Sequence, residues 1–174
     1  MNNKSFLISI FLTAFIDMLG VGIIIPILPA VFYSKDALHF GFTSESEIRW
    51  SYCMLLASFS MMLFIGAPIL GSLSDRYGRK KILLMSIIGT AVGYALFSVA
   101  IHIQSLALLY ISRIIPGFFA GSLSVLFSSI SDISSDSDKP KNFALVGIAF
   151  GLGFVFGPMI GGLLSDKSIV SWFS

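Results

Sequence analysis

Long apolar runs separated by short polar stretches form the main pattern of this sequence. Five runs are long enough to cross a bilayer, at about residues 6–33, 50–73, 82–101, 105–130 and 142–164. A sixth run opens at residues 168–174. None of them shows the period-two alternation of a barrel strand, and backbone amides inside a bilayer must pair within their own segment. The pattern predicts an all-α fold, a polytopic membrane helix bundle with five transmembrane helices and the start of a sixth.

Composition supports the bilayer as the surroundings of the chain. The sequence is 56% hydrophobic and 11% charged, with a mean hydropathy of +0.93, whereas a soluble domain carries roughly a quarter charged residues. This excludes a soluble globular domain and makes the lipid bilayer the first predicted partner. The net charge of +2 comes from cations beside apolar runs and not from a basic stripe, so we predict no nucleic-acid partner.

Residues for enzyme chemistry are sparse. His39 and His102 are the only histidines in the sequence, and no metal-ligand spacing or nucleophile motif accompanies them. We therefore predict that the protein is not an enzyme, and that it has no metal site.

The distribution of Lys and Arg between the polar stretches predicts the topology. The first run contains Asp17 and is longer than the apolar core of a signal peptide, so we interpret it as a retained helix. One side of the membrane then receives seven of the 11 cations: Lys4, Arg76, Arg79, Lys80, Lys81, Lys139 and Lys141. The other side receives Lys35, Arg49 and Lys167. The positive-inside rule places the richer side, with the N-terminus, in the cytoplasm.

Two charged residues lie within apolar runs, where they are costly. Arg113 is about eight residues into the fourth run, hence about 12 Å deep, and burial of an arginine there costs about 3 kcal/mol on insertion scales. Asp17 is near the middle of the first run. The alternatives are that Arg113 extends to the membrane surface and that Asp17 makes a structural hydrogen bond between helices. The functional interpretation is that both line a substrate or proton pathway.

Proline and glycine mark two further helices. Pro26 and Pro29 remove backbone donors from the first run and predict a kink, in a helix that either lines a cavity or is a bent scaffold. In the fifth run, small residues at intervals of four predict close helix packing, either as a rigid contact or as a hinge. The packing motif consists of Gly153, Gly157, Pro158, Gly161 and Gly162.

The polar stretch between the second and third runs carries the densest charge. Positive-inside selection explains its cations, but not Asp75, which lies at the negative end of a helix dipole. We infer that Asp75 has a partner, either in a salt bridge within the loop or at the N-terminus of another helix. A conformational latch is the sharper hypothesis, because surface ion pairs alone contribute about 0–1 kcal/mol.

These motifs resemble those of the major facilitator superfamily. The loop between the second and third runs is similar to that family's signature there: Gly71-x-Leu73-x-Asp75-Arg76-x-Gly78-Arg79-Lys80. The fourth run contains Leu109-x-x-x-Arg113-x-x-x-Gly117, with Pro116 where Gln is common. The glycine motif of the fifth run resembles that of drug:proton antiporters. The pattern at 17–29 and the Ser131–Asp132 pair at the end of the fourth helix are closest to tetracycline-efflux transporters.

The resemblance implies a proton-driven exporter of a drug-like or tetracycline-like small molecule, in the inner membrane of a bacterium. Asp17 and Arg113 would face a central cavity, and Asp75 with Arg79 would latch the cytoplasmic side. No cofactor is implied. The coupling ion would be the proton, driven by its gradient across the membrane. The alternatives are a carrier of the same family for another small solute, and a nonfunctional membrane remnant.

Length is the point at which the sequence departs from that family. Such transporters have about twelve helices in two halves, so we interpret residues 1–174 as an incomplete N-terminal bundle. The missing C-terminal half would be a partner, and we expect the chain to be inactive alone.

Overall fold

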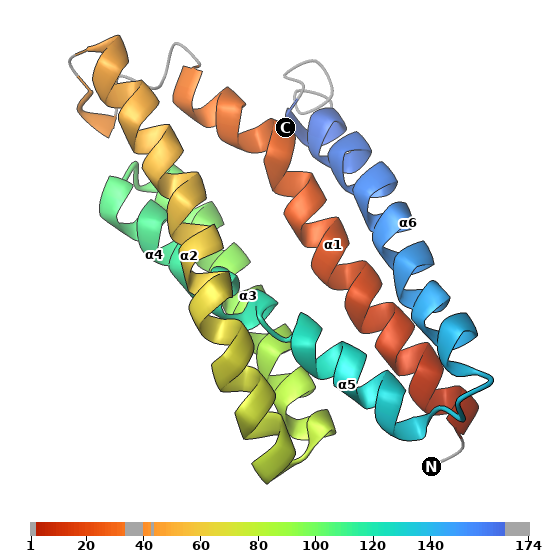
Figure 1. Ribbon diagram of the computed structural model, residues 1–174. Helices are drawn as coiled ribbons and strands as arrows, with labels where there is room; N and C mark the ends of the chain where they lie inside the picture. The colour runs from red at the N-terminus through yellow and green to blue at the C-terminus, as the bar shows by residue number, and fades with distance from the viewer. Residues whose placement is uncertain (1–2, 34–39, 43, 166–174) are drawn as a thin grey trace. The chain divides into compact units, whose positions relative to one another are not determined.

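The computed structural model of the protein describes residues 3–33, 40–42 and 44–165. These residues form helices and no strand, so the all-α prediction is confirmed (Figure 1). The helices are α1 (Asn3–Tyr33), α2 (Glu45–Tyr77), α3 (Arg79–His102), α4 (Leu106–Ala120), α5 (Leu123–Ile133) and α6 (Lys139–Ser165). The predicted sixth run at 168–174 lies outside the described residues.

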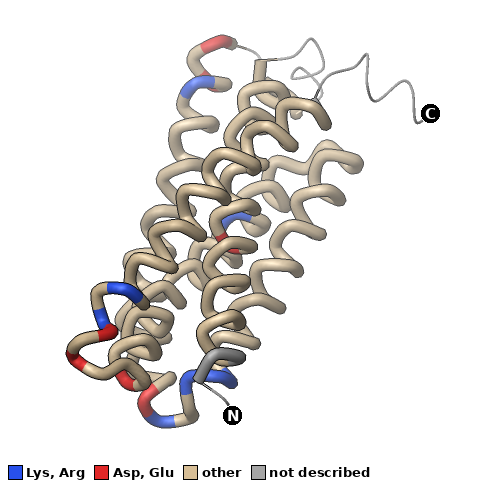
Figure 2. The backbone as a smooth tube through the Cα atoms, turned by 90° about the vertical axis from the view of Figure 1, so that its right-hand side faces the viewer, with Lys and Arg blue, Asp and Glu red and all other residues tan. Residues whose placement is uncertain are grey.

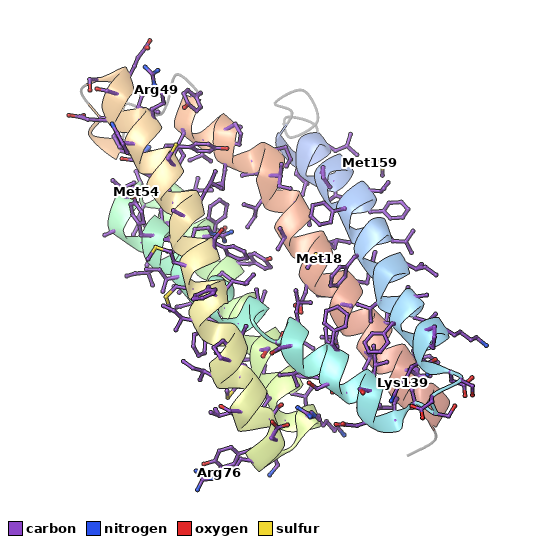
Figure 3. All side chains as sticks on the ribbon, viewed as in Figure 1. Met18, Arg49, Met54, Arg76, Lys139 and Met159 are labelled. Atoms are coloured by element: carbon purple, nitrogen blue, oxygen red, sulfur yellow. The ribbon has the colours of Figure 1, made fainter. Side chains whose placement is uncertain are left out.

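Five spans in the described chain are long and apolar enough to cross a membrane. They are Phe6–Tyr33, Glu45–Tyr77, Arg79–His102, Leu106–Ile133 and Lys139–Leu164. Most of the charged residues lie near helix ends, and the middle portions of the helices are almost entirely uncharged (Figure 2). Arg49 and Arg76, for example, lie at opposite ends of α2 (Figure 3). The protein is therefore an integral membrane protein.

The helix α2 is longer at both ends than the apolar run predicts. Its first turn contains Glu45 and Glu47, whose negative charges are favourable at a helix N-terminus. The Ser44 side chain caps this turn by accepting a hydrogen bond from the Glu47 N–H at 3.3 Å. Hydropathy alone misses such a polar first turn because its residues are stabilised by capping and not by burial.

The fourth predicted run, residues 105–130, corresponds to one candidate span, Leu106–Ile133, which is not a single unbroken helix. A turn at Gly121 and Ser122 divides the fourth span into α4 and α5. The Gly121 N–H donates to Phe118 O at 3.2 Å and the Ser122 N–H to Phe119 O at 3.0 Å, so i→i+3 bonds replace the α-helical pattern here. A Cβ at Gly121 would collide with the backbone of Ala67 on α2. The turn is thus packed directly against a neighbouring helix.

The described residues fall into two compact units, one within residues 1–34 and 130–174 and the other within residues 35–129. In the first unit, α1 and α6 lie side by side (Figure 1). Added Cβ atoms at Gly153, Gly157 and Gly161 of α6 would touch Met18, Gly22 and Ile23 of α1, respectively. Because the residue numbers rise together on both helices, α1 and α6 are parallel.

In the second unit, α4 packs against both α2 and α3. The Tyr110 hydroxyl donates to Ser51 O on α2 at 3.1 Å. On the other side, Gly93 of α3 abuts the ring of Pro116 so closely that a Cβ would collide with it. Fully buried leucines fill the interior of this unit: Leu55, Leu70, Leu109 and Leu126.

Candidate functional site

Arg113 is buried within the second unit. The residue is 4% exposed. It is buried together with Leu109 and Pro116, which lie about one turn away on α4. The guanidinium carbon lies 4.5 Å from the ring centroid of Phe97 and 5.5 Å from that of Tyr94, both on α3. The side chain therefore turns towards protein and does not extend along the outside of α4 to the membrane surface.

Two nitrogens of Arg113 are buried without a hydrogen-bond partner among the described residues, Nε and Nη2. Aromatic rings attract the cation by about 0.5–2 kcal/mol, but they lack the lone pairs that N–H groups require. Leaving a buried donor of a charged group unsatisfied costs about 1–3 kcal/mol or more. The arrangement is consequently suited to receive an acceptor from outside this group of side chains.

Asp17 is likewise buried, in the first unit. It is 8% exposed and lies one turn after Thr13 and Ala14, which are also buried. The Thr13 hydroxyl donates to Ser9 O at 2.9 Å within α1, so it is committed to its own helix. The next residue, Met18, contacts α6 at Gly153. Burial of a carboxyl group near the middle of a span marks a candidate functional residue.

The predicted packing motif of the fifth run forms the interface between α6 and α1. An added Cβ at Gly157 would lie 2.7 Å from Gly22 Cα, and one at Gly153 would lie 2.6 Å from Met18 Cβ. Pro158 also faces this interface, because a Cβ at Gly22 would lie 2.9 Å from its Cδ. Gly162 does not, since an added Cβ there meets no described atom within 4 Å. All members of the motif except Gly162 thus lie close to α1 in this structure.

The predicted latch motif forms the junction between α2 and α3. Asp75 Oδ1 lies 2.7 Å from Arg79 Nη1, so the salt bridge within the loop is present. The same nitrogen donates to Ser74 Oγ at 2.6 Å, and Ser74 Oγ in turn donates to Gly71 O at 2.7 Å. This chain of contacts ties the first turn of α3 to the last turns of α2.

Gly78 makes the sharp change of direction between these helices. Its φ of 95° lies in the region that favours glycine, and its N–H donates to Ser74 O at 3.0 Å. The guanidinium carbon of Arg76 lies 5.8 Å from the ring centroid of Tyr77, and Lys80 is exposed. Arg76 and Lys80 are therefore available at the surface, whereas Arg79 is occupied by Asp75 and Ser74.

The remaining predicted residues lie near helix ends. Pro26 and Pro29 are inside α1, which changes direction towards its C-terminal end (Figure 1). Asp132 is exposed on the last turn of α5.

A cavity of about 470 Å³ lies along the start of α2, lined by Ser46, Arg49, Trp50 and Cys53. Among the described residues, no three His, Cys, Asp or Glu side chains gather as metal ligands.

Sequence reasoning missed the aromatic surroundings of Arg113 and the turn in the fourth span. Tyr94 and Phe97 are two aromatic residues among the many in this sequence, and no motif singles them out. The turn had a usable signal, because Gly117 and Gly121 are four residues apart and Pro116 precedes them.

Comparison with known proteins identifies the family of this chain. The sequence model of the Major Facilitator Superfamily matches residues 10–173. The chain is 40% identical over 95% of its length to the tetracycline resistance protein, class H, of Pasteurella multocida, and 36% identical over 97% to the class C protein of Escherichia coli. It is 30% identical over 92% to major facilitator superfamily domain-containing protein 10 of Bos taurus. The chain spans about two fifths of these relatives, namely 39%, 40% and 39% of their lengths.

Proposed function

Because this chain belongs to the major facilitator superfamily, we propose that it forms the N-terminal part of a proton-coupled transporter that exports a tetracycline-like small molecule. The observation that carries this proposal is the buried Arg113, whose Nε and Nη2 have no partner among the described residues. Such a charge is expensive in a membrane and is retained where it serves a solute or ion pathway. The names of the class H and class C relatives suggest the substrate class.

Asp17 and Arg113 have complementary parts in this proposal. Asp17 is a carboxylic acid near the middle of a span, able to exchange a proton as its surroundings alternate between wet and dry. Arg113 supplies a fixed positive charge on α4. Binding of a proton at one group and of solute near the other would couple the two movements through the alternating access of the transporter.

The α2–α3 junction and the α1–α6 interface have mechanical roles in the same proposal. The Asp75–Arg79 pair holds the junction together and serves as part of a cytoplasmic latch. The glycine stripe of α6 keeps α1 and α6 as one rigid element during rocking.

We further propose that the N-terminus lies in the cytoplasm of a bacterium, on the side rich in Lys and Arg. Cysteine introduced by Tyr77→Cys should react with an impermeant reagent only in inverted vesicles. Phe40→Cys should react in intact cells. Both are made in a Cys53→Ser background, because Cys53 is itself exposed. Reaction of the Tyr77→Cys protein from outside intact cells would reverse the proposed topology.

Transport is proposed to require the part of the fold that the relatives have beyond the matched region. We expect no sustained efflux from vesicles that contain only these 174 residues. Joining the chain to the C-terminal remainder of the class H relative should confer tetracycline resistance on a susceptible host. In the joined protein, Asp17→Asn and Arg113→Ala should each abolish resistance at equal membrane abundance. Unchanged resistance in both variants would refute the proposed roles.

A carrier for a different small solute is the second candidate. The chain is also similar to the Bos taurus protein, whose name specifies the superfamily alone, so membership of the family does not by itself fix the solute. Loss of resistance in the joined protein, combined with uptake or efflux of another solute, would favour this candidate over tetracycline export.

A further inference from the structure

The cavity at the start of α2 lies where this helix enters its apolar stretch. It measures about 470 Å³ and is lined by Ser46, Arg49, Trp50 and Cys53. The last three residues follow the first by three, four and seven positions, so all four share one face of α2. The cavity therefore has a polar end towards the helix N-terminus and an apolar end towards the middle of the span.

The polar end carries one charge of each sign. Glu45 precedes Arg49 by four positions, so it lies about one turn further from the apolar stretch. Glu45 Oε2 and Arg49 Nη2 are 3.9 Å apart, and the two side chains are 95% and 68% exposed, respectively. This separation is longer than a hydrogen bond between nitrogen and oxygen, which is about 2.7–3.2 Å. Both groups therefore keep hydrogen-bonding capacity for another partner.

The apolar end continues along α2 as a row of exposed side chains. Trp50 is 67% exposed, and Met54, Met61 and Phe64 follow it on the same face at 53%, 64% and 79%. Arg49 lies near the end of α2, and Met54 lies further along the helix (Figure 3). Tryptophan is typical of the boundary between headgroups and hydrocarbon. From Trp50 to Phe64 the row extends about 21 Å, which exceeds the hydrocarbon depth of one leaflet, about 15 Å.

The order of chemical groups along this face matches that of one class of phospholipid. Towards the middle of the span, the carboxylate of Glu45 is followed by the guanidinium of Arg49 and then by apolar side chains from Trp50 onwards. A headgroup that ends in a primary ammonium presents the ammonium first, then the phosphate and then the acyl chains. Guanidinium binds phosphate oxygens through two parallel hydrogen bonds, and ammonium donates hydrogen bonds to carboxylate.

Other common headgroups fit this order less well. An anionic headgroup without an ammonium would bring a second negative charge close to Glu45. A quaternary ammonium has no N–H to donate to the carboxylate. The pair formed by Glu45 and Arg49 thus distinguishes between headgroups that all contain a phosphate.

We propose that this face of α2 is a binding site for a phospholipid with a phosphate and a primary ammonium, of which phosphatidylethanolamine is the simplest example. Glu45 binds the ammonium and Arg49 binds the phosphate. The cavity beside Trp50 and Cys53 receives the beginning of an acyl chain. The site is independent of the transported solute and belongs to the leaflet at the N-terminal end of α2, which is the outer leaflet in the proposed topology.

The fluorescence of Trp50 tests this site directly. The sequence contains two tryptophans, Trp50 and Trp172, so Trp172→Phe leaves Trp50 as the only one. The 174-residue chain with this substitution is placed in phosphatidylcholine bilayers that contain a variable fraction of one brominated phospholipid, because bromine quenches a nearby indole. The brominated lipid has an ethanolamine, glycerol or choline headgroup and the same acyl chains. The ethanolamine lipid should bind roughly three- to tenfold more tightly than the other two, as expected for exposed charged contacts.

Two variants separate recognition of the headgroup from general attraction of lipid. Glu45→Gln should reduce the preference for the ethanolamine lipid to nearly onefold. Glu45→Arg combined with Arg49→Glu keeps the net charge but reverses the order of the charges, and should also remove the preference. Glu47→Gln is the matched control, because Glu47 is an exposed carboxylate of the same helical turn on a different face. Circular dichroism of each variant shows whether the helices are retained.

Each contrary outcome overturns the inference for a different reason. Equal quenching by the three brominated lipids would show that Trp50 meets only bulk lipid. Stronger binding of the glycerol lipid would show that Arg49 acts without Glu45. A preference that persists in Glu45→Gln or in the reversed pair would show that the order of charges is irrelevant. Absence of quenching by every lipid would show that protein, such as a second copy of the chain, covers Trp50.

Discussion

The contact between α1 and α6 makes a quantitative prediction about two glycines on one helix. A Cβ at Gly157 would lie 2.7 Å from Gly22 Cα and 2.9 Å from Leu19 O. Both are backbone atoms, which cannot rotate away as a side chain can. Ordinary carbon contacts are about 3.5–4.0 Å, so Gly157→Ala should force the two helices apart by roughly 1 Å.

Gly151 provides the matched control. It lies on the same helix, and a Cβ there meets no described atom within 4 Å. Gly→Ala in a helix gains about 0.5–1 kcal/mol from the backbone alone, whereas overpacking costs about 1–3 kcal/mol. Gly151→Ala should therefore be neutral or stabilising. The stabilisation of the helix backbone by alanine is common to both variants. Gly157→Ala should therefore be less stable than Gly151→Ala by about 1–3 kcal/mol, the cost of overpacking.

Equilibrium unfolding in mixed micelles with increasing SDS, followed by circular dichroism, measures this difference. Gly153→Ala and Gly161→Ala should behave like Gly157→Ala, and Gly147→Ala should behave like the control, because its position is also open among the described residues. Equal free energies of unfolding for Gly157→Ala and Gly151→Ala would show that the close contact does not hold α1 and α6 together.

Three further predictions concern turns and polar contacts. Gly78→Ala should lower the free energy of unfolding by about 1–3 kcal/mol, because a φ of 95° strains any other residue; an unchanged midpoint in the SDS titration would argue against this turn. Ser124→Ala should cost about 0.5–1.5 kcal/mol, since its single hydroxyl proton is shared between Ala67 O at 3.0 Å and Gly121 O at 2.9 Å, and Ser124→Thr should retain the stability. The hydrogen bond and charge of Lys139 lower the pKa of Asp136 below its usual 3.8. Its stabilising contribution is therefore present above that value and lost as the pH falls through the lowered pKa, and Asp136→Asn should remove this pH dependence of thermal unfolding.

The sequence identifies the charged residues that are costly to place in this protein, but not the side chains that surround them. Asp17 and Arg113 stand out because a charge within an apolar run is rare, and both are buried in the structure. Asp75 opposes the helix dipole and therefore requires a partner, and Arg79 Nη1 lies 2.7 Å from Asp75 Oδ1. In these cases the physical cost is a property of one residue and its position along the chain.

What the sequence could not predict depends on how helices are rotated and paired. Spacing alone indicates that the glycines of α6 pack closely, but not that α1 is the helix they contact. The proximity of Phe97 to Arg113 results from the Gly93–Pro116 contact between two helices. The turn at Gly121 likewise depends on the backbone of Ala67, which is distant in the sequence.

The central claim, proton-coupled export of a tetracycline-like molecule, is tested most directly in inverted membrane vesicles that contain the chain joined to the C-terminal remainder of the class H relative. An imposed pH gradient, acidic inside, should drive accumulation of labelled tetracycline, and collapse of the gradient should release it. Asp17→Asn and Arg113→Ala should each reduce the initial rate to that of empty vesicles. Accumulation that is independent of the pH gradient, or equal in both variants and the parent, would contradict the account.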